Sequence, residues 1–256
     1  MGPVTTSDHP VGIDFGGTGI KGAPVDLAAG DFAADRERVP TPRPSTPDAV
    51  AAVFVDLLAR FPDCHGAVGV TVPGVVHHGV VHTAANIDRA WIGTDADALF
   101  TTATGRDVHV VNDADAAGLA EVRYGAAKGR NGLVIVTTLG TGIGSAMVYD
   151  GVLVPNSELG HLEIDGKVAE TRAANSAREA EDLSWEKWAK RLTTYYRTLE
   201  KLFSPELFVV GGGVSKKAEN FLPLLDLDTE IVPATLRNKA GAVGAALYAA
   251  EESGTA

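Results

Sequence analysis

Two short glycine-rich runs carry the residue types that bind phosphate. The first is VGIDFGGTGIKG, residues 11–22, and the second is LGTGIGSAMVYDG, residues 139–151; each contains Gly-Thr-Gly-Ile after an apolar stretch and reaches an aspartate nine or ten positions on. Glycine turns allow close backbone approach and point successive N–H groups into a concavity that suits anions. Two such hairpins can grip a phosphate chain from both sides, although either run alone is also typical of an ordinary tight β-turn.

The first run also matches G-x-G-x-x-G at Gly17, Gly19 and Gly22, the pattern of a dinucleotide-binding site. That pattern must open a helix, but Pro24 follows closely and IKGAPVD is typical of a second strand. The motif of P-loop NTPases fails as well, because Ile20 precedes Lys21 where that motif requires glycine. The residues therefore argue against a nicotinamide-dependent oxidoreductase.

Two aspartates stand where strands end. Asp14 lies beside the first glycine turn, where a carboxylate would repel phosphate unless a cation came between them. Asp113 follows the strand DVHVVND and precedes a helix-like stretch, and phosphoryl transfer needs a carboxylate that orients the attacking hydroxyl and accepts its proton. The alternative is structural: a turn-capping Asp14, and Asp113 or Asp115 as the N-cap of ADAAGLAE.

Alternating strands and helices must position these residues. Apolar periodicity predicts strands at 11–15, 20–25, 67–72, 108–111, 133–138 and 207–210, and helices at 46–61, 114–127 and 184–203, the last with Ser184 as N-cap. Glycine turns and polar residues gather at the strand ends. This alternation indicates an α/β architecture, in which ligands lie beyond the carboxyl ends of the strands.

Composition excludes several classes of protein. The chain has 256 residues, 45% hydrophobic and 21% charged, which can bury the core of one large or two smaller domains. It has no run long enough to span a membrane and no leader-like start, so we expect a cytoplasmic protein. Cys64 is the only cysteine, which excludes an intrachain disulfide and a multi-cysteine zinc site, and the formal charge of −11 disfavours nucleic-acid binding.

Five motifs in order resemble the sugar kinases of the ROK family, within the actin-like ATPase and hexokinase superfamily. They are DFGGTGIKG, VNDADAAGLAE, TTLGTGIGSA, ELGH and VVGGGVS, and they span nearly the whole chain. Within the family, the sequence is most similar to the bacterial polyphosphate glucokinases, whose core lacks the usual cysteine-rich zinc motif. The two Gly-Thr-Gly runs are then the phosphate loops of two duplicated halves.

The resemblance implies a fold and an activity. The fold is a two-lobed, ribonuclease H-like α/β fold with a cleft between the lobes: a small N-terminal lobe at 1–110, completed by a C-terminal helix at 240–256, and a large lobe at 111–239. The activity is transfer of a terminal phosphoryl group from inorganic polyphosphate, and from ATP, to the 6-hydroxyl of glucose, giving glucose 6-phosphate. The resemblance also implies that the protein uses Mg²⁺, lacks zinc, does not associate with a membrane and forms a homodimer.

The resemblance also assigns site residues. Asp113 is the catalytic base, and Asp14 holds Mg²⁺ through water. The expected glucose contacts are Asn86, Asn112, Asp113, Glu158, His161 and Glu170. The expected donor contacts are Gly16, Gly17, Thr18, Lys21, Thr138, Gly140, Thr141, Gly142, Gly212, Gly213, Lys216 and Lys217. Lys21, Lys216 and Lys217 are equally typical of a solvated surface.

The segment HLEIDGKVAETRA departs from the family pattern. In zinc-containing members the histidine that matches His161 ligates metal together with cysteines, but this segment has none. We therefore expect His161 to contact sugar, with a structural hydrogen bond as the alternative. The placement of Glu170 depends on AETRAA, which matches only the tail of the family's zinc motif.

Basic residues favour a polymeric donor. The segment 184–240 holds nine Lys and Arg against seven Asp and Glu in a chain that is otherwise acidic. Besides Lys216 and Lys217, its cations include Lys187, Lys190, Arg191, Arg197 and Lys201, which would form a track for polyphosphate. A strictly ATP-dependent hexose kinase and a noncatalytic sugar-binding protein stay open as alternatives. A ROK repressor is disfavoured, because only about ten residues precede Val11 where a DNA-binding helix-turn-helix would be needed.

Overall fold

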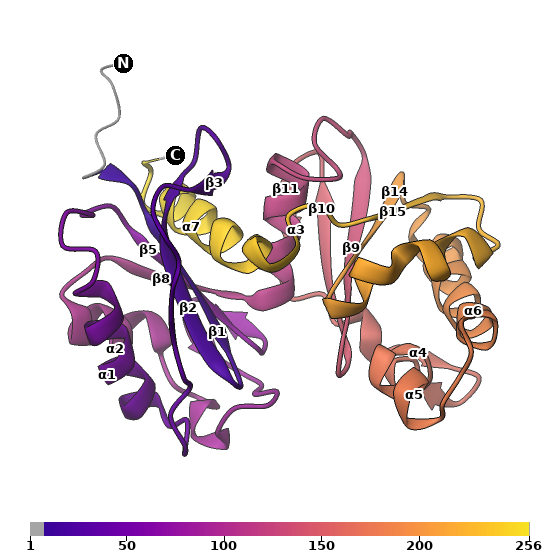
Figure 1. Ribbon diagram of the computed structural model, residues 1–256, viewed down its shortest axis with the longest axis horizontal. Helices are drawn as coiled ribbons and strands as arrows, with labels where there is room; N and C mark the ends of the chain where they lie inside the picture. The colour runs from indigo at the N-terminus through magenta and orange to yellow at the C-terminus, as the bar shows by residue number, and fades with distance from the viewer. Residues whose placement is uncertain (1–7, 256) are drawn as a thin grey trace. The chain divides into compact units, whose positions relative to one another are not determined.

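The computed structural model describes residues 8–255 and divides the chain into two compact α/β units (Figure 1). The first runs to residue 120 and includes the C-terminal segment from residue 239; the second is residues 121–238. The first unit therefore extends ten residues past the boundary expected at 110, and it is the longer of the two. The reason is that β8 (Val108–Asn112) pairs with β5 (Val68–Val72) along its whole length, and Ala116 just after it contacts Gly244 in the C-terminal segment.

The first unit is built on a six-stranded sheet of order β3-β2-β1-β5-β8, in which β4 also pairs with β2. The β1–β2 pair is an antiparallel hairpin, whereas β1, β5 and β8 run parallel. The four strands expected from the sequence are all present, each within one residue of its expected bounds. The remaining bounds are β1 Val11–Gly16, β2 Gly19–Asp26, β3 Asp31–Phe32 and β4 Glu37–Val39.

Helices α1 (Pro47–Leu58) and α2 (Ala96–Thr104) cover one face of this sheet. Alternate strand residues point to that face and are apolar, so Ile13 and Phe15 pack with Phe54 and Phe100, whose rings stack at 4.4 Å. Helix α1 ends three residues before the expected position, because the chain tightens there into i→i+3 hydrogen bonds, from Arg60 N to Leu57 O and from Phe61 N to Leu58 O.

The opposite face is covered by α7 (Ala240–Glu252), which packs against β1, β5 and β8. Eight of the thirteen residues in its sequence, AGAVGAALYAAEE, are Ala or Gly, which lets its backbone lie directly on the sheet. A Cβ atom on Gly12 or on Gly69 would lie 1.8 Å from the carbonyl oxygen of Ala242 or Ala245, respectively. This face therefore requires glycine in the strands beneath the helix.

The second unit has a five-stranded sheet of order β11-β10-β9-β14-β15. Strands β9 and β10 form an antiparallel hairpin, and β14 and β15 follow in parallel, which repeats the order hairpin, parallel, parallel of β2-β1-β5-β8. The weak internal repeat in the sequence is therefore matched in topology. The bounds are β9 Leu133–Leu139, β10 Ile143–Tyr149, β11 Val152–Val154, β14 Leu207–Gly211 and β15 Glu230–Pro233.

Helix α6 (Trp185–Phe203) covers one face of the second sheet with a buried stripe that includes Trp188, Tyr196 and Leu199. It begins as expected, since the Ser184 side chain accepts from the N–H of Lys187. Helix α3 (Asp113–Arg123) starts in the first unit and its last turn enters the second.

Glu121, on that last turn, is a buried carboxylate with several backbone partners. It is 1% exposed and accepts from the N–H groups of Ala126, Thr235 and Leu236 at 2.7–3.1 Å. The segment where the chain enters the second unit and the segment just before it leaves are therefore joined by one carboxylate.

Shorter elements complete the described chain. They are β6 Val76–His77, β7 Val80–Val81, β12 Glu163–Ile164, β13 Lys167–Val168, α4 Glu170–Ala173, α5 Asn175–Ala180, and the 3₁₀ turns η2 Arg89–Trp91, η3 Leu159–His161, η4 Gly213–Asn220, η5 Leu222–Leu224 and η6 Arg237–Lys239. Within residues 8–255, no helix combines the length and the apolar character needed to cross a membrane.

Because α7 lies in close contact with the sheet, one methyl group added at this interface should lower the stability of the protein. Gly69→Ala should lower the free energy of unfolding by about 1–3 kcal/mol, because the methyl meets backbone that can move only with the helix. Gly241→Ala is the matched control, since its methyl would sit 3.5 Å from the nearest described atom and adds helix propensity. Urea unfolding measures both, and equal stabilities would contradict this account of the interface.

Candidate active site

Asp14 lies on β1, two residues before its end, on the face toward α7. Its Oδ2 accepts from Lys21 Nζ at 3.0 Å, and its Oδ1 lies 3.4 Å from the hydroxyl of Thr71 on the neighbouring parallel strand. Lys21 was expected to contact either donor phosphate or solvent. In the structure it pairs with Asp14, the carboxylate across the hairpin, and its contact with a donor phosphate stays a prediction.

The first Gly-Thr turn is the tip of the β1–β2 hairpin, where Gly16 pairs with Gly19 and Gly17-Thr18 make the reversal. A Cβ on Gly17 would lie 2.8 Å from the carbonyl oxygen of Asn86, so the loop that carries Asn86 packs against the turn. Asn86 itself is exposed and has a left-handed backbone, with φ of 62°. One expected sugar residue thus lies beside the expected donor loop of the same unit.

Arg38 is a residue that the sequence analysis missed. It lies on β4 opposite Lys21, and a Cβ on Gly19 would come within 3.0 Å of its Nε and 3.1 Å of its Nη2. Its guanidinium therefore lies against the first glycine turn, where it can meet an anion. The run DRERVP has mixed charges and no motif, so only the β2–β4 pairing identifies this residue.

Asn112 and Asp113 join β8 to α3, and their side chains lie in different surroundings. Asn112 is 8% exposed; its Oδ1 accepts from the N–H groups of Ala114 and Asp115 at 2.8 and 3.1 Å, and its Nδ2 donates to Gly74 O at 3.0 Å. The N-cap of α3 is therefore Asn112, rather than Asp113 or Asp115, and its amide is already engaged. Asp113 is exposed in the first helical turn.

Parallel pairing brings these groups to one edge of the first sheet. Asp14 is in register with Thr71 on β5, and the next β5 residue, Val72, is in register with Asn112. Two strand spacings separate β1 from β8, so the backbones at Asp14 and Asn112 lie about 10 Å apart. Asp14 and the Asp113 that follows Asn112 are thus brought to the same edge of the sheet, with room for a small ligand between them.

The second Gly-Thr-Gly turn lies at the tip of β9–β10 and is held from one side by α4 and α5. Glu170 Oε2 accepts from Ile143 N at 3.0 Å and lies 2.4 Å from where a Gly142 Cβ would be. Ser176 donates its hydroxyl to Thr141 O at 2.6 Å and its N–H to Gly140 O at 3.0 Å. Ser176, which no sequence pattern singled out, therefore helps to hold the turn.

Three expected sugar residues meet in the second unit. His161 Nδ1 lies 3.6 Å from Glu158 Oε2, and His161 Nε2 lies 3.6 Å from Glu170 Oε1. Burial raises the pKa of Glu158, an effect that nearby His161 reduces and Glu170 reinforces. The ELGH turn is fixed to β10 because the Ser145 hydroxyl donates to Ser157 O and accepts from Leu159 N.

The triple glycine follows β14 beside the second turn. Gly211 is in register with Thr138, and a Cβ on Gly212, which has φ of 81°, would lie 2.4 Å from Leu139 O. Beyond it, a hollow of about 730 Å³ is lined by Lys216 and Arg237 among others. Lys217 is not part of that lining, so the two neighbouring lysines face different surroundings.

The expected cationic track on α6 is partly neutralised. Arg191 pairs with Glu181, and Arg197 pairs with Asp226. Within the described part of the chain, Lys187, Lys190 and Lys201 form no ion pair.

Comparison with known proteins identifies the family of this chain. The profile of the ROK family matches residues 10–171. The polyphosphate glucokinase of Mycobacterium tuberculosis is 52% identical over 244 residues, which cover 95% of this chain and 92% of that protein.

Two solved structures agree in fold. The inorganic polyphosphate/ATP-glucomannokinase of Arthrobacter sp. strain KM has a TM-score of 0.89 and 56% identity, over 96% of this chain and 99% of that one. A ROK family glucokinase of Streptomyces griseus, solved with glucose and AMPPNP, has a TM-score of 0.78 and 25% identity, over 95% and 99%. The chain has the two-lobed actin-like hexokinase fold, and it belongs to the ROK family.

Proposed function

We propose that this protein is a polyphosphate glucokinase, which transfers the terminal phosphoryl group of inorganic polyphosphate, and of ATP, to the 6-hydroxyl of glucose. The observation that carries the proposal is the exposed carboxylate of Asp113 at the same sheet edge as Asp14 and the first Gly-Thr turn. The substrates are proposed from relatives named polyphosphate glucokinase and polyphosphate/ATP-glucomannokinase.

Asp113 acts as the general base in this proposal. The 6-hydroxyl oxygen of glucose attacks the terminal phosphorus, the bond from that phosphorus to the bridging oxygen breaks, and the hydroxyl proton passes to the Asp113 carboxylate. Glucose 6-phosphate and a chain one phosphate shorter are the products. Asn112 supports this step indirectly, because its cap fixes the first turn of α3 and therefore the Asp113 backbone.

The donor phosphates lie against the glycine turns. The backbone N–H groups of each turn can donate to phosphate oxygens, and Arg38 adds a guanidinium beside the first turn. Glu170 and Ser176 keep the second turn in shape from behind. These groups stabilise the negative charge that develops on the transferred phosphoryl group and on the leaving oxygen.

Asp14 fits a magnesium ion that is shared with the substrate. Mg²⁺ keeps several waters and binds through one or two carboxylates plus substrate phosphates, and Asp14 is a single, partly exposed carboxylate at the turn. Residues 8–255 contain no group of three or more His, Cys, Asp or Glu side chains placed to hold a metal. When bound, the ion would offset phosphate charge beside the first turn. The absence of zinc, the homodimer and the cytoplasmic location stay predictions.

Glucose is recognised in this proposal by acceptors on the second unit, and the expected contact of Asn86 with the sugar stays a prediction. Glu158 and Glu170 accept from ring hydroxyls, and His161 holds both carboxylates at 3.6 Å. Glu170 is thus a link between the two substrates, because its other oxygen binds the second donor turn.

Replacing the base should separate binding from turnover. Asp113→Asn should bind glucose nearly as well as the parent but lower kcat by about 10²- to 10⁴-fold, because the amide cannot accept the proton. Steady-state kinetics and glucose titration measure the two effects. The exposed Asp35, changed to asparagine, serves as the control, and turnover of Asp113→Asn within threefold of the parent would remove Asp113 from the mechanism.

Glucose binding should depend on the charge of Glu158. Because burial raises the pKa of Glu158, it becomes protonated at a higher pH than an ordinary glutamate, and the glucose KM should rise as the pH is lowered through that range. Glu158→Gln should raise KM at neutral pH by about 10-fold or more and abolish this pH dependence.

The exposed Glu163 on β12, changed to glutamine, is the matched control for Glu158. Parental KM values and an unchanged pH profile in Glu158→Gln would place sugar recognition elsewhere.

The donor is tested with glucose and either long-chain polyphosphate or ATP. Both should support turnover, and EDTA should stop it without changing the melting temperature, since a structural zinc site would contribute about 10 kcal/mol or more to folding. By analogy with nucleic acids, the polyphosphate KM should rise steeply with salt and the ATP KM much less. Lys216→Glu with Lys217→Glu should impair the polyphosphate reaction more. Turnover with ATP alone would favour a strictly ATP-dependent glucokinase.

A further inference from the structure

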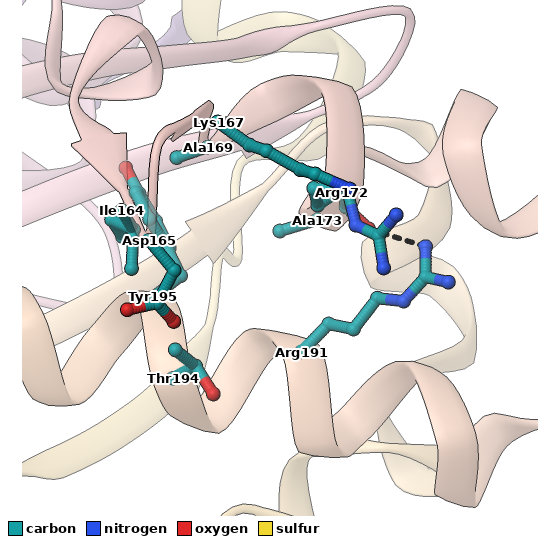
Figure 2. A pocket seen from close by; sticks show the side chains of 9 residues that line it. All are labelled: Ile164, Asp165, Lys167, Ala169, Arg172, Ala173, Arg191, Thr194 and Tyr195. Atoms are coloured by element: carbon teal, nitrogen blue, oxygen red, sulfur yellow. Dashed lines mark hydrogen bonds between the residues drawn. The ribbon is translucent and has the colours of Figure 1, made fainter.

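A second hollow of the second unit has no part in the proposed site. It measures about 280 Å³ and lies between the β12–β13 hairpin, α4 and α6 (Figure 2). The hairpin supplies Ile164, Asp165 and Lys167; α4 and the residue before it supply Ala169, Arg172 and Ala173; α6 supplies Arg191, Thr194 and Tyr195. Three cations, Lys167, Arg172 and Arg191, line this hollow against a single carboxylate, that of Asp165.

Three of the lining side chains are cations, and they face the hollow from three elements. Figure 2 shows Lys167, Arg172 and Arg191 with their charged ends on one side and the Asp165 carboxylate on the other. Arg191 also donates to the backbone oxygen of Arg172 at 3.2 Å, so two of the three are tied together. Like charges gathered in this way repel one another unless an anion lies among them.

The nearby acidic groups balance only part of this charge. Glu181 binds Arg191 through both carboxylate oxygens, at 2.8 and 2.5 Å. Its pKa is lowered first by the hydrogen bond from Arg191 and then by the charges of Arg191, Arg172 and Lys167, so one carboxylate faces three cations. Within residues 8–255, neither Lys167 nor Arg172 forms an ion pair.

The same short stretch of chain also holds the second donor turn. Glu170 and Ser176 bind the backbone of Ile143 and Thr141, and Arg172 lies between them in sequence. Residues 167–176 thus carry both the supports of the turn and the cations Lys167 and Arg172. Because Lys167 and Arg172 lie within three residues of Glu170 in the sequence, a donor long enough to extend from the turn past α4 could meet these cations, whereas a donor of three phosphates held at the turn has little chain left to do so.

We propose that this hollow binds a distal part of the polyphosphate chain, several phosphates away from the one that is transferred. The proposal rests on polyphosphate being a donor, as proposed above. It assigns Lys167 and Arg172 to a contact that only long donors make, and it leaves the chemistry at Asp113 unchanged.

The test compares donors of different length in one variant. Lys167→Gln combined with Arg172→Gln should raise the KM for long-chain polyphosphate by about 3- to 10-fold, because two exposed charged contacts are lost. Tripolyphosphate and ATP should keep their KM values within about twofold. Lys128→Gln, an exposed lysine of the same unit, is the matched control.

The salt dependence of KM and a direct binding measurement give results that a local disturbance of the structure would not produce. The slope of log KM for long-chain polyphosphate against log salt should become shallower by about 1 to 2 in the double variant. Calorimetry with long-chain polyphosphate and no glucose should show a matching loss of affinity, and inorganic phosphate should neither bind tightly nor compete. Lys167→Gln alone, on the hairpin and away from Glu170, should show part of each effect with an unchanged melting temperature.

Several results would overturn the proposal. Equal losses with all donors would indicate damage to α4, parental kinetics would show that the hollow binds no chain, and tight binding of inorganic phosphate would assign it to the free ion. If polyphosphate supports no turnover, the proposed donor is wrong. Calorimetry still tests whether the hollow binds polyphosphate. Binding that is lost in the double variant supports the proposal, and unchanged binding refutes it.

Discussion

Parallel pairing of β1, β5 and β8 is the constraint on which the candidate site depends. The three strands reach the same edge at the same level, where they present Asp14, the Pro73-Gly74 turn and Asn112, respectively. The register is protected from the other face, where Gly12 and Gly69 admit the α7 backbone. A shift of one residue would turn these glycines away from the helix and Asp14 into the core.

The second unit has the same sheet order, but different side chains support its glycine turn. Its hairpin also ends in Gly-Thr-Gly, but acidic and hydroxyl side chains support the turn instead of a cation. Glu170 binds the turn with one oxygen and faces His161 with the other. Any ligand that moves Glu170 therefore acts on the turn as well.

Sequence periodicity was sufficient for the central strands and for α6, because buried strands and an amphipathic helix leave a direct pattern. The partners of individual side chains were harder to predict from the sequence. Lys21 binds Asp14 and Asn112 caps α3, and in each case the fold brings the two partners together. Arg38 and Ser176 reach the turns from segments without a motif. The division after residue 120 also depends on contacts of the distant C-terminal helix, which local sequence does not encode.

The interrupted first unit has a consequence for the order in which the protein can be made. Residues 121–238 are contiguous, so the second unit has its whole chain once residue 238 leaves the ribosome. The first unit began earlier but lacks α7, and until that helix arrives its sheet exposes Gly12, Gly69 and their neighbours on one face. The half of the protein that is synthesised first is therefore the half that is completed last.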